Sequence, residues 1–191
     1  MTIYLLQPDS YDYQQLHFDR RLFLSKAKNI QEQRQYLAFS LHNLPLEPFW
    51  EGSWVGEFRS DDDESHRPIP DISMWLPGTM ILSPKAYKVL AELISTCGEL
   101  LPVNCQGERF YIFNCMTIVN ADEAGSRRTM EGGRIVSIDK LNFSPTSRAI
   151  FKTTYDNTWG LYCQEAVKDA IERSHLSGMQ VSEELSRSFD Q

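Results

Sequence analysis

One stretch of the chain, residues 83–119, constrains the fold more than any other, because a predicted helix is followed there by the most apolar segment of the sequence. Ser83 and Pro84 indicate the helix start, since Ser is a favoured N-cap and Pro at the first helical position gives up no backbone hydrogen bond. Gly98 indicates the end, since Gly readily adopts the left-handed conformation that closes helices. Apolar residues between them recur every three or four positions and predict one buried helix face (Ala86, Val89, Leu90 and Leu93).

Residues 110–119 (FYIFNCMTIV) follow a predicted turn at Gln106 and Gly107, and they predict a strand. The segment is rich in aromatic and β-branched residues, which favour strands. It is too apolar for a strand with one face in water, and such a composition is typical of strands that are covered on both faces. We therefore expect this strand in the middle of a sheet.

The remaining pattern predicts a mixed α+β fold with a mainly antiparallel sheet and two main helices. The second main helix is expected at residues 165–174, with an apolar face of Ala166, Val167, Ala170 and Ile171. Helices do not alternate regularly with strands, which disfavours a doubly wound fold. Further strands are expected at residues 3–6, 49–58, 134–139, 148–155 and 159–163.

The same pattern divides the chain into three parts. Residues 1–48 are expected to form a smaller N-terminal lobe, with a helical stretch at 29–42. Residues 49–181 form the main α+β domain. Residues 182–191 are polar and predict a mobile tail.

Composition and charge narrow the class of function. The 191 residues are 41% hydrophobic and 24% charged, as in a folded globular domain, and the formal net charge is -7. Nucleic acids and anionic membranes select for basic surfaces, so neither is expected as the partner, whereas a basic protein is compatible. The N-terminus lacks a signal-peptide pattern, and no apolar run approaches the roughly 18 residues that span a bilayer. We expect a cytoplasmic protein whose four cysteines are buried thiols.

No catalytic, metal or cofactor motif stands out. A hydrolase of the Ser-His-Asp type is disfavoured because the GxSxG pattern is absent, although four histidines are present. Glu172 and His175 have the spacing of ferritin-like ligands, but no second copy accompanies them. Gly132 and Gly133 lack the Lys-Ser/Thr that would follow in a phosphate loop. We therefore predict neither a cofactor nor a metal, and no enzyme activity.

A protein-binding surface is the remaining candidate, and we place it on the arm and loop of residues 49–64. Like charges in a row stay solvated, and they can also accelerate association with a basic protein. Calcium binding is disfavoured, because the acidic run lacks the spaced ligands and the Gly of an EF-hand. Three tryptophans (50, 54 and 75) lie near this run; each is either a core residue or an interface anchor. The predicted partner-binding residues are Trp50, Trp54, Glu57, Asp61, Asp62, Asp63 and Glu64.

Several short motifs resemble one known family. Pro70 and Asp71 precede the Ser83-Pro84-Lys85 helix start, and Leu176-Ser177-Gly178-Met179 follows the second helix. Between them come the strand 111–114, the loop from Asn120 to Ser126, and the pairs around residues 150–152 and 161–162. With these features, residues 50–180 resemble the DUF1629 (Imm11) family of bacterial immunity proteins.

The resemblance implies a non-enzymatic role. Proteins of this family are thought to be encoded beside secreted toxins and to bind and block the toxin made by the same cell. It implies no catalytic residue. Two other readings stay open: an enzyme of unrecognised type, for example one that reverses a toxin's modification, and a structural subunit of a larger assembly.

Overall fold

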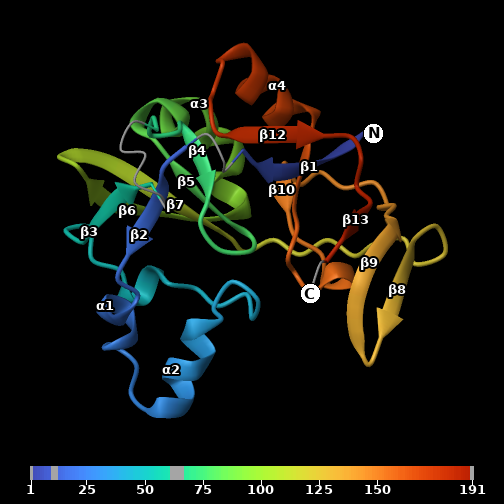
Figure 1. Ribbon diagram of the computed structural model, residues 1–191, viewed down its shortest axis with the longest axis horizontal. Coiled ribbons are helices and arrows are strands. Elements are labelled where there is room, and N and C mark those ends of the chain that lie inside the picture. The colour runs from blue at the N-terminus through green and yellow to red at the C-terminus, as the bar shows by residue number, and fades with distance from the viewer. Residues whose placement is uncertain (1, 10–12, 61–66, 190–191) are drawn as a thin grey trace.

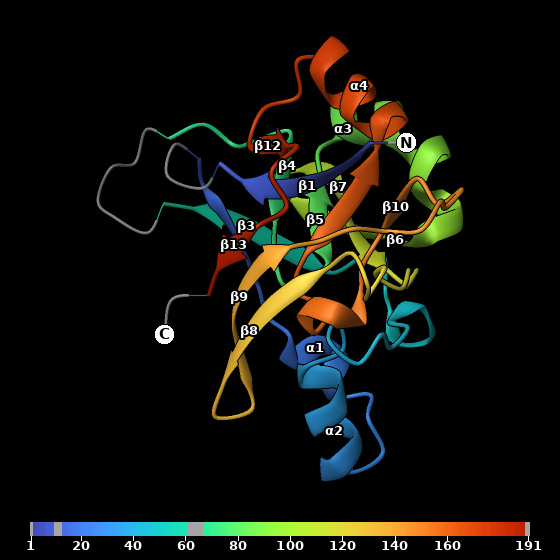
Figure 2. The ribbon, with the colours of Figure 1, turned by 90° about the vertical axis from the view of Figure 1, so that its right-hand side faces the viewer.

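The computed structural model describes residues 2–9, 13–60 and 67–189, and it confirms an α+β fold with mostly antiparallel sheets (Figures 1 and 2). In these ranges the chain forms thirteen strands and four α-helices. The strands belong to a six-stranded, a four-stranded and a three-stranded sheet. The longest helix has 11 residues, and among the described residues no helix has the length and apolar character to span a membrane.

The six-stranded sheet is the centre of the molecule. All neighbouring strands in it are antiparallel except β3 and β6, which are parallel. β7 lies inside this sheet between β6 and β5, as predicted, but it ends at Cys115 rather than at residue 119. In sheet order, the strands are β2 (Gln15–Phe18), β3 (Val55–Arg59), β6 (Gly98–Cys105), β7 (Glu108–Cys115), β5 (Thr79–Leu82) and β4 (Ile72–Met74).

Both faces of β7 are covered from Phe110 onward, which accounts for the apolar run at residues 110–113. Phe113 and Cys115 belong to a core cluster that includes buried residues of the two main helices. Phe110 and Ile112 alternate with them and belong to a second, aromatic-rich cluster on the other face. The period of two along the strand thus distributes its side chains between two cores.

The two main helices form as predicted, with small differences. α3 (Pro84–Ile94) begins at Ser83, whose hydroxyl accepts a hydrogen bond of 3.1 Å from the Ala86 N–H. Its buried side chains are Ala86, Leu90 and Ile94. α4 (Glu165–Arg173) buries Val167 and Ile171, whereas Ala166, expected on the apolar face, is exposed.

Gly98 has a role that differs from the prediction. A 3-10 helix, Ser95–Cys97, extends α3, and Gly98 then begins β6 with a φ of 178°, an extended rather than a left-handed backbone. A Cβ atom at this position would lie 2.2 Å from the Asn114 carbonyl oxygen. Gly is therefore needed for the close approach of β6 to β7 and not for a left-handed turn.

The four-stranded sheet joins the two ends of the chain. β1 (Ile3–Pro8) lies between β11 (Leu161–Gln164) and β12 (Met179–Ser182), and β10 (Ile150–Phe151) lies at the far edge. The strands predicted near residues 3–6 and 159–163 are thus present. Residues 1–48 do not form a lobe of their own, because β1 and β2 are strands of two sheets made with later parts of the chain.

The three-stranded sheet contains part of the predicted tail. β8 (Arg127–Glu131) pairs with β9 (Arg134–Lys140), and β9 pairs with β13 (Arg187–Ser188). The Arg187 guanidinium also forms an ion pair with the fully buried carboxylate of Asp156. The tail as far as Ser188 is therefore held to the body, which corrects the expectation of a mobile segment from residue 182.

The helical part of the N-terminal region is shorter than predicted. α1 (Arg21–Leu24) and α2 (Ile30–Leu37) lie together on one side of the body in both views (Figures 1 and 2). The strand expected at 49–58 begins only at Val55, and a 3-10 helix, Glu47–Phe49, precedes it. Pro48 within this turn has no N–H to donate to a sheet, which disfavours an earlier strand start.

Candidate interaction surface

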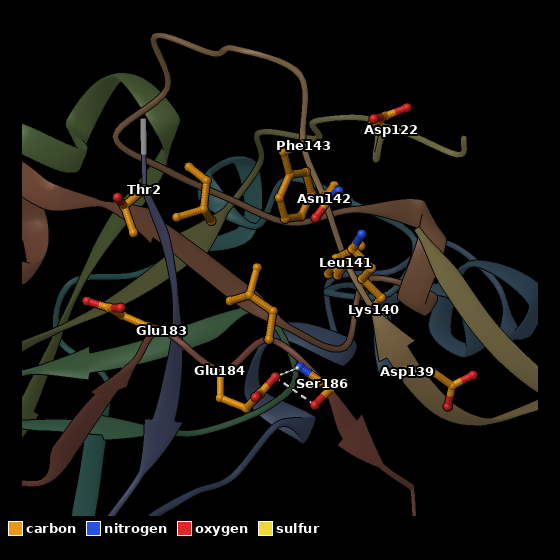
Figure 3. A pocket seen from close by; sticks show the side chains of 12 residues that line it. Thr2, Asp122, Asp139, Lys140, Leu141, Asn142, Phe143, Glu183, Glu184 and Ser186 are labelled. Carbon is orange, nitrogen blue, oxygen red and sulfur yellow. Dashed lines mark hydrogen bonds between the residues drawn. The ribbon is translucent and has the colours of Figure 1, made fainter. Parts of the chain in front are cut away.

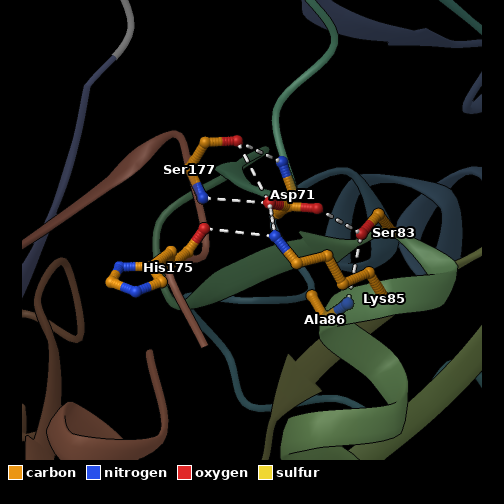
Figure 4. A network of polar contacts seen from close by, with 6 residues as sticks. All are labelled: Asp71, Ser83, Lys85, Ala86, His175 and Ser177. Carbon is orange, nitrogen blue, oxygen red and sulfur yellow. Dashed lines mark hydrogen bonds and ion pairs between the residues drawn. The ribbon is translucent and has the colours of Figure 1, made fainter. Parts of the chain in front are cut away.

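The motif residues around Asp71 come together in one polar network (Figure 4). One Asp71 carboxylate oxygen lies 2.8 Å from the Lys85 ammonium and accepts hydrogen bonds from the Ser177 N–H and hydroxyl. The other accepts a bond of 3.2 Å from the Ser83 hydroxyl. The Lys85 ammonium also donates to the backbone carbonyl of His175. This network, which we call the clasp (Asp71, Ser83, Lys85 and Ser177), ties the start of α3 to the segment after α4.

The clasp is structural in its chemistry. The Ser83 hydroxyl donates to the Asp71 carboxylate and accepts from the Ala86 N–H as the cap of α3, so both of its bonds lie within the structural network. The His175 side chain is exposed at a position with a φ of 48°, just after α4. Across the described parts of the chain, no group of three His, Cys, Asp or Glu side chains could hold a metal ion. Asp71, Ser83, Lys85 and Ser177 thus fix how the start of α3 meets the segment after α4.

The cysteines and the most deeply buried lysine also lack an open site. All four thiols are buried and free, as predicted. Burial raises the pKa of Cys105 to about 11 and that of Cys115 to about 12, so both stay protonated at neutral pH. Lys152 is fully buried, and its ammonium donates a 2.6 Å hydrogen bond to the Ser40 carbonyl. These groups are buried in the core, away from solvent.

A hollow of about 490 Å³ lies between the start of β1, the segment after β9 and the segment before β13 (Figure 3). Four carboxylates line it, but Figure 3 shows them around its margin rather than pointing at one place. Hydrogen bonds from Ser137 and Thr129 lower the pKa of Asp139, and bonds from Ser186 lower that of Glu184. These two carboxylates are held ionised, unlike a general acid. The four are Asp122, Asp139, Glu183 and Glu184.

The predicted arm offers less apolar surface than expected. Trp54 is only 8% exposed, and Trp50 is half-buried with its indole N–H donating a 2.7 Å hydrogen bond to the Pro102 carbonyl. Both pack in the second core cluster, and Phe18 stacks on Trp50 with ring centroids 5.3 Å apart. Trp75 is half-buried in the same cluster. Of the two readings of these tryptophans, core and anchor, the structure favours core.

The acidic part of the arm is described only in part. Glu57 on β3 is exposed and forms an ion pair of 2.5 Å with Arg59 on the same strand. Asp61, Asp62, Asp63 and Glu64 lie outside the described residues, as does His66. The arm therefore places Glu57 at the surface, while its two tryptophans point into the core.

A different part of the molecule exposes large apolar side chains. Ile30 at the start of α2 is 65% exposed and Leu37 at its end is 46% exposed. They are seven residues apart, two helical turns, and so lie on one side of the helix. α2 buries none of its residues. Trp159 is 51% exposed, and Leu41 and Met130 are also exposed.

Hydrogen bonds link these exposed residues through one connecting segment. The Thr158 hydroxyl donates a 3.3 Å bond to the Leu41 carbonyl, next to the end of α2. On the other side, Arg128 of β8 donates to the Tyr155 carbonyl, and its guanidinium lies 4.5 Å from the Tyr155 ring centroid. Trp159 directly follows Thr158 in the chain, and its ring packs edge-to-face on the ring of Phe189.

We call this region the fork. Its prongs are the segment 28–42, which contains α2, and the β8–β9 hairpin (127–140). Its base is the segment 154–159. The two prongs project from the same side of the molecule in both views (Figures 1 and 2). Monomeric proteins seldom leave an amphipathic helix uncovered, so the fork is the strongest candidate for an interaction surface.

The sequence contained part of this signal. The apolar positions Ile30, Tyr36, Leu37 and Leu41 were expected to share one helix face. Tyr36 packs on Phe49, with ring centroids 4.6 Å apart, whereas the other three are exposed. Periodicity shows that a face is apolar, but not whether the rest of the chain covers it. Trp159 and Met130 carried no signal of their own, because the fold alone brings their segments to the same side.

Comparisons with known proteins add no function to this geometry. A scan against models of protein families found no match, and neither did a search among curated proteins.

Proposed function

We propose that this chain is an immunity protein that binds and neutralises a cognate bacterial toxin by direct protein–protein contact in the cytoplasm. The observation that carries the proposal is the exposed apolar surface of the fork. Trp159 is 51% exposed, and an exposed Trp is typical of the anchors at the centre of protein interfaces. The resemblance of residues 50–180 to the DUF1629 family supports the same role.

Inhibition by contact requires no reacting group. A tight complex that occludes the toxin's active site, or a surface that the toxin needs, is sufficient. The buried thiols and the satisfied Ser83 hydroxyl are in line with such a role. So is the clasp, whose polar groups bond to one another rather than to an open site.

Co-expression with the toxin-like protein encoded beside this gene tests the proposal. Growth is scored first, and size exclusion of the purified mixture follows. Rescue of growth with co-elution is the expected result. Rescue without co-elution would favour the rival, an enzyme that reverses the toxin's modification. No rescue, with an active toxin in the control, would contradict the immunity role.

A further inference from the structure

Charge is distributed unevenly over this acidic chain. Residues 19–43 contain five basic and two acidic residues, and residues 127–140 contain four basic and two acidic ones. These two segments, which include both prongs of the fork, therefore carry nine of the 19 basic residues and a net charge of +5. The other residues contain 10 basic and 22 acidic side chains, a net charge of -12. The fork itself (28–42, 127–140 and 154–159) contains six basic and four acidic residues, a net charge of +2 within a chain of net charge -7.

Several of these cations are available to a partner. Lys28, Arg34, Arg128 and Arg134 are exposed. Within the ranges that the structure describes, no carboxylate forms an ion pair with Arg34 or Arg134, whereas Lys26 is paired with Glu51 at 2.5 Å. An exposed Arg with no partner gains more from an incoming carboxylate than one that must first leave an internal ion pair.

The apolar residues decide which class of anion fits. A nucleic acid would use cations and stacking rings, but the aliphatic side chains of Ile30, Leu37 and Leu41 would contribute little to binding phosphates. A symmetric pair of forks would bring two basic regions together, which opposes a two-fold dimer through this surface. A protein surface with apolar residues at its centre and carboxylates around them matches both the exposed apolar side chains and the basic side chains of the fork.

We infer that the fork docks an acidic surface of the partner protein, with the partner's carboxylates meeting Arg34 and Arg134 and its apolar centre meeting Leu37 and Trp159. This inference rests on the proposed function and names the chemistry of the toxin's contact surface. It also moves the interface away from the acidic loop, which would have selected a basic toxin.

Charge-reversal variants test the inference. The double variant R34E/R134E places one reversed charge on each prong. The matched control K88E/R109E reverses two exposed cations on α3 and β7, outside the fork. Each double variant lowers the formal charge from -7 by four units, so the control corrects for the overall change. Binding to the purified toxin-like neighbour is measured by surface plasmon resonance at low and high salt, and thermal melting confirms that each variant is folded.

The expected result is a loss of affinity of about tenfold or more for R34E/R134E, mainly through a slower association rate, with little change for the control. The association rate of the unmodified protein should also fall as salt increases, and R34E/R134E should flatten this dependence.

Other outcomes distinguish the inference about the acidic partner surface from the proposed immunity role. A wild-type complex that R34E/R134E leaves unchanged, or weakens no more than the control does, overturns the inference and leaves the immunity role standing. A complex that dissolves after nuclease treatment, or a chain that is already a dimer through the fork, overturns the inference as well. No complex between the unmodified proteins contradicts binding itself, and both proposals then fail.

Discussion

Asp71 joins the start of α3 to the chain that follows α4. Its side chain is only 18% exposed, and it accepts hydrogen bonds from Ser83, Lys85 and Ser177. Burial by itself would raise the pKa of this carboxyl group, but these bonds and the charge of Lys85 outweigh it, and the pKa lies below the usual 3.8. The ionised form is therefore the one that stabilises the fold.

Replacing Asp71 by Asn tests the clasp. The amide keeps only one of the two acceptor oxygens that Ser83 and Ser177 use, and the ion pair with Lys85 would be lost. We expect the free energy of unfolding to fall by about 1–3 kcal/mol, measured by urea denaturation at pH 7. Glu92→Gln, on the exposed face of α3, is the control, with an expected change within about 0.5 kcal/mol.

The same variant predicts a pH dependence. A carboxyl group with a lowered pKa in the folded state stabilises the protein above the unfolded value, near 3.8, and loses this effect as the pH falls below it. The difference between the wild type and Asp71→Asn should therefore be largest near neutral pH and shrink below about pH 4. A difference that grows on acidification would contradict the role given to the carboxylate.

Lys152 gives an opposite case, because its charge is buried without an ion pair among the described residues. Burial lowers the pKa of its ammonium below 10.5, although Cys115 and Asp156 oppose the shift. The unfolded chain then binds more protons between the two pKa values, so this residue makes stability rise with pH in that window. We expect Lys152→Met to be at least as stable as the wild type at pH 7, with an advantage that shrinks toward pH 10.

Denaturation of both proteins across this pH range provides the measurement. Lys152→Ala serves as the comparison, because it removes the charge and also leaves a cavity, and it should lose about 2–5 kcal/mol. If Lys152→Met is destabilised as much as Lys152→Ala, the Lys152 ammonium contributes more to the free energy of unfolding than the packing of its aliphatic chain.

The main elements were largely predictable from the sequence, and the exceptions have physical reasons. α3 and α4 were found from their caps and apolar periodicity, and β7 from its continuous apolar run. The strand expected at 49–58 was misplaced because its aromatic residues, Trp50 and Trp54, pack in the core from a turn rather than from a sheet. β12 and β13 were missed because short polar strands depend on distant partners for their pairing.

Gly98 provides a test at the level of strand pairing. Gly98→Ala places a Cβ atom 2.2 Å from the Asn114 carbonyl oxygen, so β6 and β7 must separate locally. We expect a loss of about 2 kcal/mol or more in the free energy of unfolding. Gly107→Ala in the β6–β7 turn is the comparison: its φ is 87° but no atom lies within 4 Å, so only strain of about 1 kcal/mol is expected. Equal effects at the two sites would contradict the close-approach argument.

α2 offers a test of exposure. If its apolar side is uncovered, Ile30→Ser together with Leu37→Ser removes no core contact, and the free energy of unfolding should change by less than about 1 kcal/mol. Leu90→Ala, in the buried face of α3, should lose about 2–5 kcal/mol in the same denaturation assay. A large loss of unfolding free energy for the α2 double variant would show that Ile30 and Leu37 pack in the core. They could then not contact a partner at the fork.

At the scale of the whole molecule, the sequence could not indicate where a binding surface lies. Net charge is a sum over the chain, and it cannot reveal that the basic residues of 19–43 and 127–140 gather on one side. Nor does the sequence show that the Thr158 hydroxyl meets the Leu41 carbonyl, since these two residues are close only in the fold. The predicted interface of residues 49–64 rested on local acidity, whereas the fork is assembled by tertiary contacts.

Hydrogen exchange of the chain, alone and with the toxin-like neighbour, tests whether the fork is the binding surface, because it maps the contact surface without a mutation. Amides at a docked surface exchange more slowly when binding covers them or suppresses local opening. On binding, we expect slower exchange in both prongs (28–42 and 127–140) and in the base (154–159), with the clasp segments unchanged. Slowing confined to the hollow of Figure 3 or to residues 70–85, with no change at the fork, would contradict this expectation.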